Sequence, residues 1–189
     1  MDYIETWKEV IQRPTNFYRK MPTTGGYAEP LTFAAISSVI YGLLVALFNR
    51  RMMEGMYGYG MGGGGFGFST VLVAVIMAPI AGIISILIGS AIFYIIYKIL
   101  GGSGTYEGTV RFVSYANAVM VVYWIPIIGW IFGLYELYLY IVGGMFVHNV
   151  SMGKSAIAVL LPVVLIFLLV VIMVLVLAGS YAFSMIFPS

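Results

Sequence analysis

The sequence predicts an all-α, polytopic integral membrane protein, a bundle of five transmembrane helices behind a short amphipathic interfacial helix. Of its 189 residues 62% are hydrophobic and only 8% are charged, and the mean hydropathy is +1.04. Several apolar runs reach the roughly 20 residues that cross about 30 Å of hydrocarbon. In lipid every backbone N–H and C=O must be paired within the fold, so these runs must be helices.

The composition excludes several classes of site. The chain has no cysteine and one histidine, His148, which excludes disulfides and thiolate ligands and removes most metal sites and nucleophilic triads. We therefore expect no bound metal, no cofactor and no enzymatic activity. The net charge of +2 comes from few charged residues, so we expect no nucleic acid as a partner.

The N-terminal arm, residues 1–29, begins with a predicted amphipathic helix over residues 1–18. Its apolar face carries Ile4, Trp7 and Val10. Asp2 is placed to cap its first turn, and Pro14 interrupts it. This helix either lies on the lipid headgroups, with Trp7 as an interfacial anchor, or docks on the cytosolic face of the bundle. Both placements remain open on the sequence.

Residues 30–189 form the predicted transmembrane domain. The third and fourth spans form a hairpin that turns at residues 125–129, between the interfacial aromatics Trp124 and Trp130. The fifth span is almost purely aliphatic, which favours a lipid-facing helix. The expected spans are residues 31–48, 70–99, 110–124, 130–147 and 159–177.

Small residues recur at helical spacing along three of these spans. Such stripes let transmembrane helices approach one another closely. The helix-packing positions predicted in this way are Ser38, Gly42, Gly82, Gly89, Gly129, Gly133 and Gly143.

Three shorter features separate the spans. Pro79 either kinks the second span or ends a surface turn before it, and the glycines of residues 101–104 indicate a helix C-cap and turn. His148 is expected to cap the fourth span. Residues 52–68 hold eight glycines and four methionines and indicate a mobile loop. Thioether binding of Cu(I) there is the weaker alternative, through Met52, Met53, Met56 and Met61.

The basic residues predict the topology. Seven of the nine lie in the arm, in the loop after the second span or after the fourth: Lys8, Arg13, Arg19, Lys20, Lys98, Arg111 and Lys154. Only Arg50 and Arg51 lie on the other side. The positive-inside rule therefore predicts a multi-pass protein of the cell membrane with a cytosolic N-terminus and an outer C-terminus.

Glu136 is the candidate functional residue, because an ionisable group within a span is costly and marks a functional site by default. The predicted hairpin places Asn117 at the same depth, about 14 Å from the turn, so the two side chains are expected to form an intramembrane polar pair. The pair would serve either as a proton or cation relay or, as we favour, as a buried hydrogen bond that fixes the hairpin.

The order of landmarks along the chain resembles the Yip family, five-span membrane proteins named as interactors of Ypt/Rab GTPases. The landmarks are Trp7, Arg13-Pro14, Phe17, Pro30-Leu31, Phe33, Gly101-Gly102, Gly104-Thr105-Tyr106, Tyr115, Ile125-Pro126 and Gly129. The resemblance implies a role in membrane organisation, as in members implicated in trafficking between ER and Golgi. The chain has only about thirty residues before its first span and lacks the Asp-Leu-Tyr-Gly stretch of the trafficking members, which argues against a Rab-type partner and fits the prokaryotic branch.

Two functions follow from these observations. We favour a non-catalytic scaffold or adaptor that associates with itself or with other membrane proteins in the bilayer. The alternative is a small transporter or ion conductor organised around Glu136 and Asn117. Five spans without an evident inverted repeat count against transport.

Overall fold

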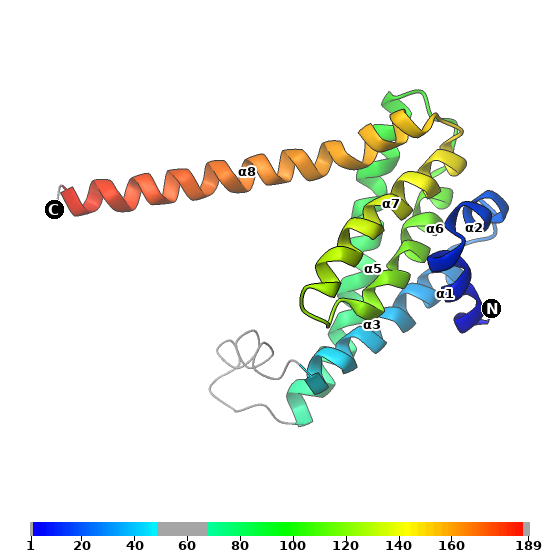
Figure 1. Cartoon of the computed structure of the whole chain (residues 1–189), viewed down its shortest axis with the longest axis horizontal. Helices are drawn as coiled ribbons and strands as arrows, with labels where there is room; N and C mark the ends of the chain where they lie inside the picture. The colour runs from blue at the N-terminus through cyan, green and yellow to red at the C-terminus, as the bar shows by residue number, and fades with distance from the viewer. Residues whose placement is uncertain (1, 49–67, 187–189) are drawn as a thin grey trace.

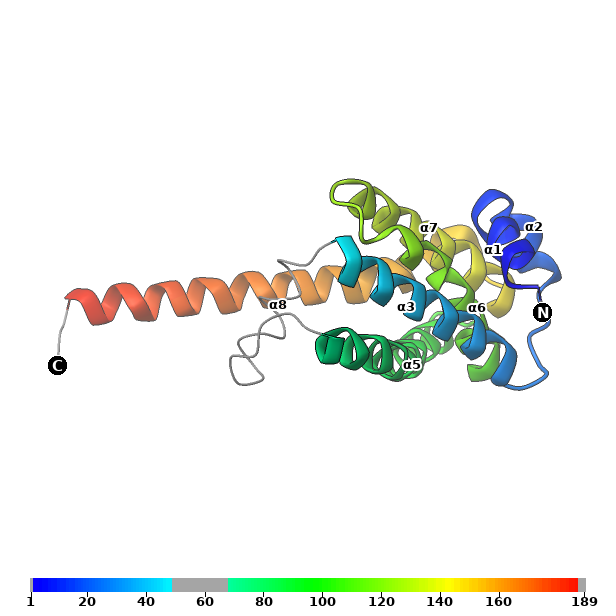
Figure 2. The same cartoon turned by 90° about the horizontal axis from the view of Figure 1, so that it is seen from below.

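The computed structural model describes residues 2–48 and 68–186, and this part of the chain is helical without strands. Four helical segments, α3, α5, α6–η2 and α7, pack side by side as a bundle (Figure 1). Helices α1 and α2 cover one side of the bundle, and α8 projects from the opposite side (Figure 2). The elements are α1 (Tyr3–Gln12), α2 (Pro14–Lys20), α3 (Ala28–Phe48), α5 (Phe68–Ile99), α6 (Tyr106–Ala116), the 3₁₀ helix η2 (Asn117–Val122), α7 (Ile128–His148) and α8 (Met152–Ile186).

The predicted N-terminal helix is two helices, α1 and α2. Asp2 caps α1 as predicted, because its Oδ1 accepts hydrogen bonds from the backbone N–H groups of Ile4 at 3.0 Å and Glu5 at 3.2 Å. The break falls at Arg13, whose helical conformation is disfavoured by the following proline. Pro14 then occupies the first turn of α2, where no N–H is required.

The α1–α2 unit docks on the bundle, which is one of the two placements left open by the sequence. The side chain of Val10 is fully buried. The Tyr3 hydroxyl lies 2.9 Å from Oγ of Ser37 on α3, and the Tyr135 hydroxyl on α7 donates to the backbone carbonyl of Ile11 at 2.6 Å. These contacts join α1 to two different helices of the bundle, so α1 is part of the folded core.

Four helices in the described residues are long and apolar enough to cross a membrane: Ala28–Phe48, Val75–Ile99, Ile128–His148 and Met152–Ser180. The predicted third span is not among them, so the five-span architecture is not confirmed. That segment is the short helix α6 followed by η2. Helix α6 is nevertheless the most enclosed element of the bundle, with buried residues from Gly108 to Ala116.

The end of α5 forms the predicted C-cap. Gly101 has a φ of +84°, a conformation that glycine adopts without a steric cost. The N–H of Gly102 donates to the carbonyl of Tyr97 at 2.7 Å, which is the closing bond of a Schellman motif. Pro79 lies inside the continuous helix α5, so the alternative that it ends a preceding turn is wrong.

The hairpin between η2 and α7 turns where the sequence predicts. The N–H of Gly129 donates to the carbonyl of Ile125 at 2.8 Å, and α7 begins at Ile128. Ile127 closes the turn with a φ of +69°, which is unfavourable for a β-branched residue. The turn exposes 76% of this side chain.

Helix α8 leaves the bundle soon after it begins. Its buried residues are Ser155, Ala158 and Val159, which contact the bundle within the first turns. Beyond them, residues 160–180 are exposed apart from Pro162, and the helix runs across the direction of α5 and α7 (Figure 1). The predicted fifth span is thus a single unbroken helix with an apolar surface on every side.

The predicted mobile loop, with its four candidate thioether ligands, lies outside the described residues except for Phe68, which begins α5. Arg50 and Arg51, the two basic residues assigned to the outer side, also lie outside the described residues.

Candidate functional site

Glu136 lies in the middle of α7 between two tyrosines. The hydroxyl of Tyr123 donates to Oε2 of Glu136 at 2.5 Å, and the hydroxyl of Tyr140 donates to Oε1 at 2.8 Å. Tyr140 is one helical turn further along α7, whereas Tyr123 comes from the segment that follows η2. Each carboxylate oxygen therefore has one phenolic donor, from opposite sides of the hairpin.

A glycine on α7 makes room for the backbone of Tyr123. A Cβ added at Gly129 would lie 2.8 Å from the backbone oxygen of Tyr123, closer than real Cβ atoms approach. A Cβ at Gly133 would lie 4.0 Å from the Tyr123 hydroxyl. Gly129 and Gly133 precede Glu136 by seven and three residues, so all three lie on one face of α7.

The predicted hydrogen bond between Glu136 and Asn117 is not made. Nδ2 of Asn117 donates instead to the backbone carbonyl of Val113 at 3.1 Å. The prediction assumed an α-helix before the turn, but residues 117–122 are 3₁₀ helix. Six residues of 3₁₀ helix rise about 3 Å more and turn about 120° further than six of α-helix, so the depth and the facing side both change.

The sequence reasoning missed Tyr123 and Tyr140 as partners of the carboxyl. Tyr140 carried a usable signal, because side chains four residues apart are neighbours on a helix. The sequence holds no such signal for Tyr123, since its approach to Glu136 depends on the 3₁₀ conformation of η2.

No basic side chain pairs with Glu136 in residues 2–48 and 68–186, where the ion pair joins Arg111 to Glu29. A third tyrosine, Tyr18 on α2, lies close enough to Glu136 for an electrostatic interaction with its carboxylate. Burial raises the pKa of the Tyr18 hydroxyl well above its usual value, and the charge of Glu136 adds to the shift. Tyr18 is therefore a neutral donor, and its hydroxyl reaches the backbone carbonyl of Phe112 at 3.4 Å.

Two grooves flank this cluster. The first, of about 610 Å³, lies at the hairpin end and is lined by Tyr123, Trp124 and Gly133 among other residues. The second, of about 480 Å³, runs along α5 and is lined by Tyr140 and Asn117 together with Gly82 and Gly89. Glu136 thus connects two tyrosines that open into different grooves.

The predicted packing residues occupy different environments. A Cβ at Gly82 would lie 2.9 Å from Oγ of Ser38, so α3 and α5 meet there, and a Cβ at Gly143 would lie 2.9 Å from Cβ of Phe112 on α6. Gly42 is buried in α3. A Cβ at Gly89 would meet nothing within 4 Å, because this glycine lines the second groove.

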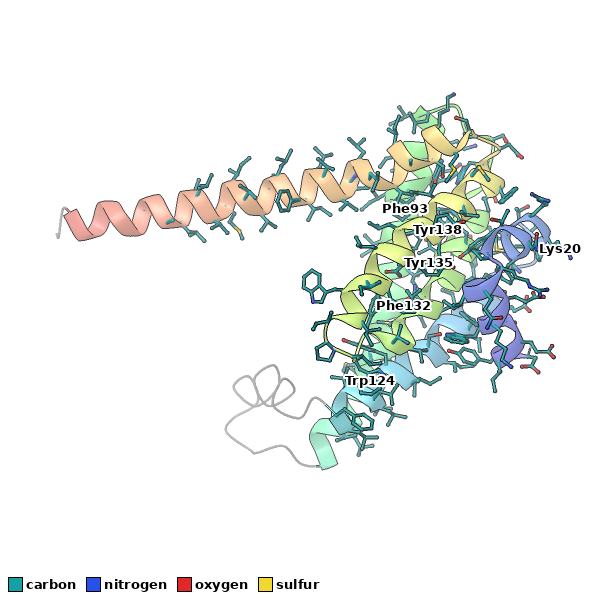
Figure 3. All side chains as sticks on the ribbon, viewed as in Figure 1. Lys20, Phe93, Trp124, Phe132, Tyr135 and Tyr138 are labelled. Carbon is teal, nitrogen blue, oxygen red and sulfur yellow. The ribbon has the colours of Figure 1, made fainter. Side chains whose placement is uncertain are left out.

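The three tryptophans also differ. Trp130 is 85% exposed beside the hairpin turn. Trp124 stacks on Phe48 at the end of α3, with ring centroids 4.6 Å apart, and lies at the hairpin end of the bundle (Figure 3). Trp7 points into the bundle instead, where its indole N–H donates to the backbone carbonyl of Ala118 in η2 at 2.8 Å.

His148 does not cap α7 with its side chain. It is fully buried, its ring stacks on Tyr97 with centroids 4.1 Å apart, and its Nε2 lies 2.9 Å from Oγ1 of Thr109. The Thr109 hydroxyl also lies 2.9 Å from the carbonyl of Thr105, so Thr109 connects the His148 ring to the start of α6. Asn149 takes the cap position, with a φ of +52°. Within the described residues no group of three or more His, Cys, Asp or Glu could hold a metal ion.

The comparison with protein families agrees with the resemblance seen in the sequence. The model of the Yip1 domain matches residues 8–183, nearly the whole chain. The chain belongs to the Yip1 domain family. This membership and its apolar helices make it a membrane-embedded Yip-family protein, and the family is generally non-enzymatic. The comparisons found no match to a curated protein or to a solved structure.

Proposed function

We propose that this Yip-family protein is a non-catalytic membrane scaffold or adaptor that associates with itself or with other membrane proteins. The observation that supports this proposal most strongly is the long apolar helix α8, whose side chains in residues 160–180 are almost all exposed outside the bundle. Helices that are apolar on every side find their contacts with lipid or with other transmembrane helices.

The position of Glu136 within the described residues also supports a scaffold. Its carboxyl accepts hydrogen bonds from the hydroxyls of Tyr123 and Tyr140. A carboxyl held on both oxygens by phenols rigidifies the hairpin. A rigid bundle with one projecting helix is suited to holding membrane partners at a fixed spacing.

We further propose that α6 and η2 together form the fifth crossing. Their combined rise is about 28 Å, close to the thickness of the hydrocarbon core. An odd number of crossings agrees with the positive-inside arrangement in the cell membrane, N-terminus in the cytosol and C-terminus outside. The proposal involves neither nucleic acid nor a Rab-type GTPase.

Single-cysteine crosslinking tests the scaffold function, because the chain has no cysteine of its own. Cysteine is introduced in turn at Phe167, Leu168, Leu169 and Val170, which sample the whole circumference of α8, and thiols are oxidised in native membranes. We expect covalent dimers, or crosslinks to another membrane protein, at positions on one face. The matched control is Ile88→Cys on the exposed side of α5, which should stay monomeric. Equal crosslinking at all five positions, or none at any, would contradict the proposal.

One observation favours transport as a second candidate. Glu136 connects tyrosines that line two different grooves, which is an arrangement that could pass a proton along the carboxyl. The test is proton or cation flux in proteoliposomes, with wild type compared with Glu136→Gln. A flux that Gln abolishes while the variant folds normally would establish transport in place of the scaffold.

A further inference from the structure

A polar cavity separate from Glu136 lies between the N-terminal helices and the bundle. It measures about 310 Å³ and is lined by residues of α1, α2, α3 and α6 and of the connection between α2 and α3. Figure 3 places Lys20, one of its lining residues, at the outer edge of the α1–α2 unit, on the side opposite to α8. The cavity opens beside the start of α3, where the chain enters its first apolar span.

The cavity gathers charges of both signs that do not pair with one another. Arg13 and Lys20 are basic, and Glu9 and Glu29 are acidic. In the part of the chain that the structure describes, no ion pair engages Glu9, Arg13 or Lys20, and Glu29 reaches Arg111 only through Oε2, at 3.4 Å. Because these basic and acidic side chains share a cavity without pairing with one another, both kinds of charge remain available to bind a ligand.

Uncharged polar groups complete the lining. The ring of Tyr115 is buried, and its hydroxyl, like the side-chain amide of Asn16, makes no hydrogen bond within residues 2–48 and 68–186. Arg111 on α6, the partner of Glu29, is only 1% exposed, and its Nη1 donates to the carbonyl of Gly26 at 2.8 Å. Its buried Nε has no partner. Arg111 does not line the cavity, but it places a positive charge beside Glu29, and Tyr115 and Asn16 supply hydrogen-bonding capacity in the lining that the protein does not use.

We propose that this cavity binds a zwitterion that carries a phosphate and a primary ammonium, the chemistry of a phosphoethanolamine headgroup. The phosphate would be held by Arg13, whose planar guanidinium binds phosphate in bidentate fashion, and by Lys20. The ammonium has three N–H donors, which match the carboxylates of Glu9 and Glu29 and the oxygen of Tyr115. A simple anion would be repelled by the two carboxylates, and a simple cation by the two basic groups.

The same chemistry could come from a lipid or from a soluble molecule, and binding experiments distinguish them. The full-length protein in detergent is titrated with phosphatidylethanolamine, phosphatidylcholine, phosphatidylglycerol and free phosphoethanolamine, and bound ligand is read by native mass spectrometry. We expect phosphatidylethanolamine to bind about tenfold more tightly than phosphatidylcholine, which has no N–H donors, or phosphatidylglycerol. Free phosphoethanolamine that binds as tightly would identify a soluble zwitterion as the source, and weak competition by it would identify the lipid.

Variants locate the site. Glu9→Gln and Lys20→Met should each weaken binding by about tenfold, the loss typical of one hydrogen bond to a charged group. Glu5→Gln and Lys8→Met are the matched controls, since they carry the same charges on α1 outside this cavity. All four positions are exposed, so folding should be preserved, and the melting temperature of each variant verifies it. Tighter binding of phosphatidylglycerol, or equal losses in the control variants, would overturn the proposal.

Discussion

The hydroxyl of Tyr123 lies 2.5 Å from Oε2 of Glu136, across the hairpin that joins η2 to α7. This bond connects residues thirteen positions apart, and Tyr140 binds the other oxygen from within α7. The carboxyl therefore links the end of η2 to the middle of α7.

Tyr123→Phe and Tyr140→Phe should each destabilise the protein by about 1–2 kcal/mol, because each removes one donor from Glu136 without changing the packing. Unfolding in mixed detergent–SDS micelles measures the change. Combined with Glu136→Gln, each tyrosine variant should show a coupling energy, since the partners lie in direct contact. Asn117→Leu should show no coupling with Glu136→Gln, because Asn117 binds Val113. A coupling energy between Asn117 and Glu136, with none between Tyr123 and Glu136, would contradict this arrangement.

Trp7→Phe tests whether α1 is part of the folded core. The variant keeps an aromatic ring but loses the hydrogen bond to the Ala118 carbonyl, at a cost of about 1 kcal/mol. Thermal unfolding in detergent measures the loss. Trp130→Phe is the control, since that side chain is 85% exposed and should change the melting temperature little. A melting temperature of Trp7→Phe equal to that of the wild type would indicate that α1 lies on the headgroups.

Gly143→Ala and Gly89→Ala should behave differently although both glycines lie within predicted packing stripes. At Gly143 an added Cβ would lie 2.9 Å from Phe112, so alanine should cost about 1–3 kcal/mol by overpacking. At Gly89 the Cβ would meet nothing within 4 Å, and alanine should be tolerated. Stability curves for the two purified variants decide the matter, and equal losses would show that the α6–α7 contact is looser than described.

The sequence predicted the elements whose cause is local. The cap at Asp2, the left-handed Gly101 and the turn at residues 125–129 depend on a few neighbouring residues, and all three are found. The partner of Glu136 was predicted wrongly, because the prediction assumed α-helix where residues 117–122 are 3₁₀ helix. The inward position of Trp7 also depends on a tertiary contact, its hydrogen bond to η2. The sequence could not predict it, because the amphipathic pattern of α1 fits a lipid surface and a protein surface equally well.

Labelling from outside intact cells tests the topology. Ile127→Cys lies in the exposed hairpin turn, and Gly153→Cys lies at the start of α8, where a Cβ meets nothing within 4 Å. With the N-terminus in the cytosol and α6–η2 as a crossing, Ile127→Cys should react with an impermeant maleimide and Gly153→Cys only after permeabilisation. The reverse labelling pattern would show that the protein has the opposite orientation in the membrane.

The most direct test of the scaffold function is self-association in lipid. Two samples of the Gly153→Cys protein, labelled with donor and acceptor dyes, are mixed and reconstituted into liposomes at decreasing ratios of protein to lipid. A scaffold that binds its own kind through α8 predicts energy transfer that persists on dilution and disappears when unlabelled protein is added in excess. Energy transfer that falls in proportion to dilution, as for independent monomers, would contradict self-association.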